Sequence, residues 1–121
     1  MANTFKVVTF AAEPASAGTA YKMYTVAGST TTVVLGLILT NIHTTAVTVE
    51  VELVSDTGSR GGANNVTNGT AFLAKDVSIP AGTSLELLSG GKVVMETTDV
   101  LKVDCSVADK VSGTLSIMEI T

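Results

Sequence analysis

The chain has a single histidine, His43, which is the side chain best suited to acid–base chemistry near neutral pH. His43 lies in segment 41–45, NIHTT, where short polar residues follow a long apolar run and predict a turn. A catalytic triad requires a nucleophile, a base and an orienting acid within mutual reach. Hydroxyl side chains occur along the whole chain because threonine favours strands, so they single out no nucleophile. We therefore interpret His43 as a solvated turn residue and predict that the chain is not an enzyme.

Two pairs of carboxylates could supply oxygen ligands to a hard cation. They are Glu50 with Glu52, which share one face of a predicted strand, and Asp104 with Glu119. No aspartate-rich calcium loop accompanies them, and the nearby segment 55–58, SDTG, predicts only a turn. Charged residues on a strand also discourage pairing at an exposed edge. We interpret the glutamates as a solvated strand face and predict no metal and no other cofactor.

A glycine-rich segment coincides with the only arginine at residues 58–62, GSRGG. A phosphate-binding loop would end in Gly-Lys-Ser/Thr and open a helix, and neither feature follows here. The surrounding stretch 55–69 is longer than most loops inside a compact domain. Arg60 could bind a carboxylate through its planar guanidinium group. Two interpretations stay open: a flexible loop tip, or a loop that orders against a neighbouring subunit.

The single cysteine excludes an internal disulfide and a cysteine-rich metal site. Alternation in segment 101–107, LKVDCSV, places Cys105 on the same strand face as Leu101 and Val103. Free cysteine is among the most buried residue types. We predict that Cys105 is a small buried hydrophobe.

Nine short segments show strand signals, and turn residues separate them. They are residues 4–11, 19–26, 31–41, 46–54, 70–79, 84–88, 92–96, 100–107 and 113–121. Segment 46–54 gives the cleanest alternation, with Val47, Val49 and Val51 on one face. No helical periodicity persists. Strands at this spacing predict one all-β domain over residues 1–121, an antiparallel β-sandwich of about eight strands, either jelly-roll-like or immunoglobulin-like.

The composition limits the partners of the chain. Charged residues make up only 15%, the formal net charge is −4, and the seven lysines and arginines form no cluster. Nucleic-acid binding and attachment to an anionic membrane both require basic residues, so we predict neither. The longest apolar run, about ten residues, is short of the roughly 20 that a membrane helix needs. No signal peptide is evident, so we expect the chain to be made in a cytoplasm and to stay there until assembly.

Strand 31–41 is apolar on both faces, which predicts that something covers its outer face. We expect Val33, Leu35, Leu37 and Leu39 to face the core, and Val34, Gly36, Ile38 and Thr40 to face outward. The last strand is also apolar on both faces, because Leu115 and Ile117 fall on one face and Met118 and Ile120 fall on the other. The cover could be another segment of the chain or another molecule. We predict an interface with other copies or other proteins that includes Val34, Ile38, Arg60, Met118 and Ile120.

The second half of the chain resembles a module of small virion structural proteins of tailed bacteriophages. The matching segments are IPAGTSLEL at 79–87, GGKVVMETTDVLKV at 90–103 and ADKVSGTLSIMEI at 108–120. An upstream hairpin, LTNIHTTAVTVEVEL at 39–53, looks similar to the first hairpin of that module. The resemblance implies a non-enzymatic β-sandwich that forms oligomers and sits on the capsid surface or at the neck and tail.

We therefore expect a virion protein assembled in the cytoplasm of a bacterial host. The first expectation is a capsid decoration (cement) protein, a homotrimer that bridges subunits of the major capsid protein and stabilises the shell. The alternatives are a neck, tail or fibre component, and a carbohydrate-binding β-sandwich. Sugar sites usually carry exposed aromatic residues, and the chain has no Trp and only two Tyr, which disfavours that last alternative.

Overall fold

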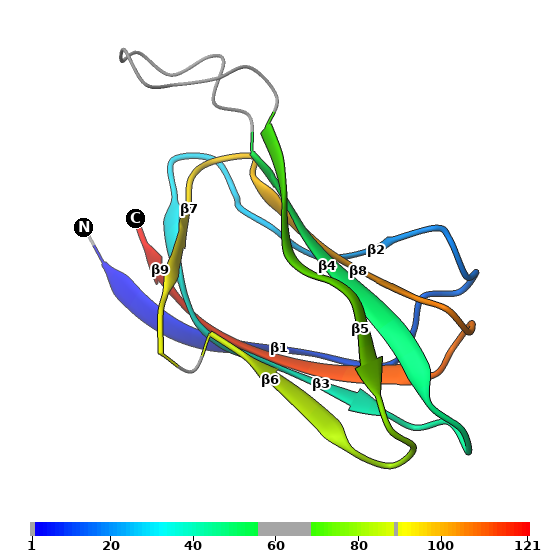
Figure 1. The fold of residues 1–121 in the computed structure, drawn as a ribbon. Coiled ribbons are helices and arrows are strands. Elements are labelled where there is room, and N and C mark those ends of the chain that lie inside the picture. Colours follow the sequence, from blue (N-terminus) through cyan, green and yellow to red (C-terminus); the bar gives the residue numbers. More distant parts are fainter. Residues whose placement is uncertain (1, 56–68, 89) are drawn as a thin grey trace.

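The computed structural model describes residues 2–55, 69–88 and 90–121, and it contains nine strands (Figure 1). Each of the nine predicted segments overlaps one of them. The strands are β1 (Asn3–Glu13), β2 (Tyr21–Thr25), β3 (Thr31–Asn41), β4 (Val47–Ser55), β5 (Gly69–Ile79), β6 (Ser84–Leu87), β7 (Val93–Met95), β8 (Val100–Cys105) and β9 (Val111–Ile120). Among the described residues, no helix is long and apolar enough to span a membrane.

The strands form two antiparallel sheets that pack as a sandwich. One sheet has the order β1-β9-β3-β6, with β7 also paired to β3, and the other has the order β2-β8-β4-β5. Strand β1 pairs with β9, β2 with β8, β3 with β6 and β4 with β5. The first strands thus pair with the last strands and the middle strands pair with each other, which is the topology of a jelly roll. An immunoglobulin-like sandwich keeps its first two strands in one sheet, whereas β1 and β2 lie in different sheets here.

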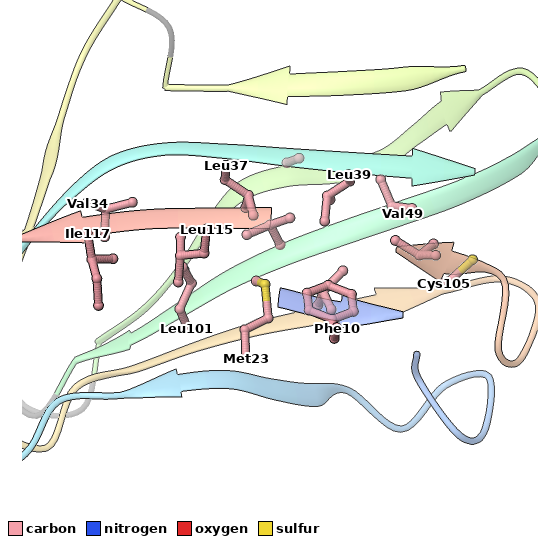
Figure 2. Packing of buried hydrophobic residues seen from close by; sticks show 14 of the residues in the cluster. Phe10, Met23, Val34, Leu37, Leu39, Val49, Leu101, Cys105, Leu115 and Ile117 are labelled. Atoms are coloured by element: carbon pink, nitrogen blue, oxygen red, sulfur yellow. The ribbon is translucent and has the colours of Figure 1, made fainter. Parts of the chain in front are cut away.

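The core lies between the sheets and consists mainly of aliphatic side chains, most of them from alternate strand positions. Val49, Leu101 and Leu115 are completely buried (Figure 2). Cys105 is 3% exposed and lies in the same cluster, as predicted. Phe10 packs over Gly113, its cross-strand partner, so closely that a Cβ at position 113 would lie 2.2 Å from the ring. Glycine at this position therefore makes room for the aromatic ring.

The expected facing of β3 is wrong in its first half, because the strand contains a β-bulge. Val34 pairs with Ile117 of β9, but the next pair is Gly36 with Ser116, so Leu35 is an extra residue. An extra residue shifts the alternation of side chains by one position. Val34, predicted to face outward, is completely buried against the core (Figure 2). Val33, predicted to face inward, is half-buried and lies on the outer face. After the bulge the expected facing holds: Leu37 and Leu39 are buried, and Ile38 is 43% exposed.

Candidate interaction surface

An apolar row crosses the outer face of the β1-β9-β3-β6 sheet. Residues that pair across neighbouring strands point to the same face of a sheet. Phe5 of β1 pairs with Met118 of β9, Met118 pairs with Val33 of β3, and Val33 pairs with Val94 of β7. We call these four residues the outer row. Phe5 is 72% and Val94 is 60% exposed, while Met118 and Val33 are half-buried between them.

Further apolar side chains flank the outer row on the same face. Val7 lies two positions beyond Phe5 on β1 and is 63% exposed. Ile120 lies two positions beyond Met118 on β9 and is half-buried. Ile38 lies further along β3 and pairs with Thr114 and with Glu86 of β6, so the face becomes more polar in that direction. The outer row and its flanks form an uncharged strip that begins at the free edge of β1.

The outer face of the opposite sheet is charged, which makes the two outer faces chemically different. Lys22 of β2 pairs with Lys102 of β8, Lys102 with Glu52 of β4, and Glu52 with Phe72 of β5. Beside this second row, Lys75 Nζ lies 3.0 Å from Glu50 Oε1 and 4.7 Å from the centre of the Phe72 ring. Ion pairs of this kind suit a face in contact with water.

The structure thus places the predicted interface residues in three different environments. Ile38, Met118 and Ile120 lie on the outer face of the β1-β9-β3-β6 sheet. Val34 is inside the core, where its side chain contacts its own subunit, so its assignment to the interface is wrong. Arg60 lies outside the described residues. The sequence interpretation missed Phe5, Val33 and Val94, which only strand pairing brings together.

The residues considered for catalysis and metal binding have structural contacts. His43 is half-buried in the β3–β4 turn, and its backbone N–H donates to Asn41 Oδ1 at 2.7 Å. Glu50 and Asp104 are cross-strand partners beside a shallow hollow of about 390 Å³, where Asp104 Oδ1 accepts the N–H of Gly18 at 3.1 Å. No group of three or more His, Cys, Asp or Glu side chains within the described part of the chain is arranged to hold a metal ion.

Glu119, the other member of the second carboxylate pair, lies on β9, in the opposite sheet from Asp104 of β8, and belongs to a cluster that connects the two sheets. Tyr24 of β2 donates to Glu119 Oε2 at 2.5 Å, and its hydroxyl is 2.8 Å from Thr32 Oγ1 of β3. Lys6 Nζ of β1 lies 2.7 Å from Glu119 Oε1. Burial and the bond to Glu119 raise the pKa of Tyr24 to about 12. The bonds from Lys6 and then Tyr24 lower the pKa of Glu119. The cluster therefore acts as a structural tie and holds its tyrosine neutral and its carboxylate ionised.

Comparison with known proteins supports the fold and gives no family. No family model matches the chain, and no curated protein matches it. Among solved structures, it is similar to a chain of Bacillus endospore appendages, a family of disulfide-linked pili, at 14% identity and a TM-score of 0.49 over 99% of this chain and 87% of that one. It is also similar to a chain of the infectious bursal disease virus Gx strain, at 15% identity and a TM-score of 0.51 over 96% of this chain. The match spans 32% of that viral chain, and at such identity it shows a shared fold alone.

Proposed function

We propose that the protein is a non-enzymatic structural subunit of a phage virion, a decoration protein that attaches to the capsid surface. The observation that carries this proposal is the difference between the two outer faces. The outer row presents four uncharged apolar side chains, whereas the opposite face presents lysine and glutamate in the corresponding row. The outer row binds the shell, and the charged face remains in water.

The occupant of the outer row is an apolar, uncharged surface of the assembled capsid. A charged partner would lose hydration on contact with Phe5 and Val94 without receiving a counter-charge from the outer row. An open sheet face without a groove also suits a broad surface better than a narrow peptide or a small ligand, which bind in grooves or pockets. The resemblance of residues 77–121 to virion modules supports a phage particle, and the jelly-roll likeness to a viral chain supports it at the level of the fold.

An estimate of the contact energy supports the proposal that the protein acts in many copies. Full burial of a large apolar side chain contributes about 1.5–3 kcal/mol, so Phe5 and Val94 together contribute about 3–6 kcal/mol. Association of one free molecule costs about 4–15 kcal/mol in lost translation and rotation. One row is therefore a weak attachment. Linked copies on equivalent sites share that cost, and this favours an oligomer on a symmetric shell.

Antibody labelling of purified phage particles tests the proposal. We expect an antibody against the chain to label the whole shell in electron micrographs. Label confined to the neck or tail would show that the protein is a neck or tail component and would refute capsid decoration. Particles without label would refute any role in the virion.

A matched pair of variants tests the attachment face. Val94→Lys puts a charge into the outer row, and Phe72→Lys puts the same charge on the opposite face, where a lysine already lies near. We expect at least a tenfold loss of particle-bound protein for Val94→Lys, because burying an unpaired charge is costly, and little change for Phe72→Lys. Equal retention of both variants would contradict attachment through the outer row.

A further inference from the structure

Strand β1 has a free edge with unusual exposure. It is the first strand of its sheet, paired to β9 on one side and, within the described residues, to no strand on the other (Figure 1). Residues 3–7 are exposed at every position, although every second one points to the inner side of the sheet. Two of them, Phe5 and Val7, are large and apolar. The amino-terminal half of β1 therefore offers both a backbone edge and an apolar surface.

The hydrogen-bonding groups at this edge follow from the register of β1 with β9. Ala2 and Thr121 exchange two backbone hydrogen bonds, N–H to carbonyl, at 3.1 and 2.9 Å. In an antiparallel pair, hydrogen-bonded and non-hydrogen-bonded positions alternate, and the register continues unbroken to the pair of Phe10 with Gly113. The even-numbered residues thus bond to β9. The N–H and C=O groups of the odd-numbered residues 3–9 point to the free edge.

Lys6 is the residue expected to block pairing at this edge, but its charge is compensated by an ion pair within its own subunit. A lysine on an edge strand usually discourages pairing, because a partner strand would bury its charge. Lys6 instead lies 2.7 Å from Glu119 Oε1, on the inner side of the sheet. Its charge is compensated before any partner arrives. The edge is therefore open to a strand of complementary pattern.

We propose that two copies pair antiparallel through β1, with a twofold axis at Phe5. In this register Phe5 lies opposite the partner's Phe5, and Val7 lies opposite the partner's Asn3. These odd-numbered positions carry the free backbone groups, so the contact forms about six hydrogen bonds, two for each of three facing pairs. Lys6 then faces the partner's Thr4. A register shifted by one residue at each strand would set Lys6 against the partner's Lys6, and like charges directly opposite are destabilising.

This pairing joins the two five-stranded sheets into one continuous sheet. The outer rows of the two copies meet end to end at Phe5, so the dimer has one long apolar row on this side and charged faces on the other side. The inference rests on the proposed function in one respect: the joined row is the surface that binds the shell. A twofold contact closes as a dimer. The trimer expected from the sequence would require a different, head-to-tail contact.

Light scattering and a disulfide test the pairing directly. We expect the wild-type chain, of 12.3 kDa, to have a mass of about 25 kDa in solution, as a dimer requires. In the Phe5→Cys variant the two new thiols face each other with Cα atoms about 5.5 Å apart, within the range of a disulfide. Mild oxidation should cross-link it at least about ten times faster than the control Asn3→Cys, whose thiols face Val7 instead. The native Cys105 is buried and does not compete.

A second pair of variants tests the backbone bonds. Val7→Pro removes an N–H that points to the free edge and leaves the bonds to β9 in place, whereas Val7→Thr keeps that N–H. We expect Val7→Pro to be a folded monomer by light scattering and circular dichroism, and Val7→Thr to remain a dimer. If Val7→Pro fails to fold, the cross-linking of Phe5→Cys decides.

The outcomes separate this inference from the proposed function. A monomeric wild-type chain, or equal cross-linking of Phe5→Cys and Asn3→Cys, would overturn the pairing. Particles that still carry the protein in that case would leave the virion role intact. A dimer that never labels particles would retain the pairing and overturn the role.

Discussion

The side chain of Val34 should contribute far more to stability than that of its neighbour Val33. The bulge at Leu35 turns Val34 into the core, where it is 0% exposed, and turns Val33 onto the outer face. Replacement by alanine removes the same two carbons at both positions. We therefore expect Val34→Ala to destabilise the fold strongly and Val33→Ala to destabilise it much less.

The magnitude follows from burial. Two buried carbons contribute about 1.6 kcal/mol by transfer, and the cavity left behind adds about 1 kcal/mol, so Val34→Ala should cost about 2.5 kcal/mol. Val33 is half-buried between two cross-strand neighbours, so Val33→Ala should cost only about 0.5–1 kcal/mol, through lost cross-strand packing. With a urea dependence of about 1–3 kcal/mol per molar, the unfolding midpoint of Val34→Ala should fall by about 1 M. If Val33→Ala lost as much stability as Val34→Ala, the position of the bulge and the composition of the outer row would both be wrong.

Four further predictions concern residues that hold the sandwich together. Gly113→Ala should cost about 1–3 kcal/mol in unfolding free energy, because the new Cβ would overlap the ring of Phe10, and Phe10→Leu should restore part of it. Glu119→Gln should lower the pKa of Tyr24 from about 12 toward 10.0 in an ultraviolet titration; an unchanged tyrosine would show that burial alone raises it. Because the pKa of Glu119 is lowered by folding, the wild-type chain should lose stability as the pH falls through and below 4.5, and Glu119→Gln should lose less of it over that range. Asn41→Ala should cost about 2–4 kcal/mol in urea unfolding, because the buried amide donates to two carbonyls and accepts one N–H; a neutral effect would exclude this bracing role.

The order of strands along the chain was predictable because each strand carries its own local signal. Alternation marks β4 by Val47, Val49 and Val51, and turns rich in Gly, Pro or Asp separate most of the other strands. Burial of Cys105 followed from the same alternation. The choice between a jelly roll and an immunoglobulin-like sandwich was not predictable, because both use short strands at similar spacing and differ only in which strands pair.

The outer row was only partly predictable, for two physical reasons. Strand β3 is apolar on both sides of Leu35, so no change of pattern reveals the extra residue, and either phase fits the first half of the strand. In addition, the row is made of residues 5, 118, 33 and 94, which come together only through pairing of distant strands. Met118 could be found from the two-sided last strand, whereas Phe5 and Val94 carry no local sign of their position.

The most direct test of the central claim is the accessibility of the outer row on assembled particles. Val94→Cys places a thiol in the outer row, and Phe72→Cys places one on the charged face; the parent residues are 60% and 47% exposed. Both thiols should react with a maleimide at similar rates in the free protein. On particles, we predict that Val94→Cys is protected at least about tenfold while Phe72→Cys still reacts, because only the outer row is covered by the shell. Equal reaction of the two thiols on particles would contradict the account.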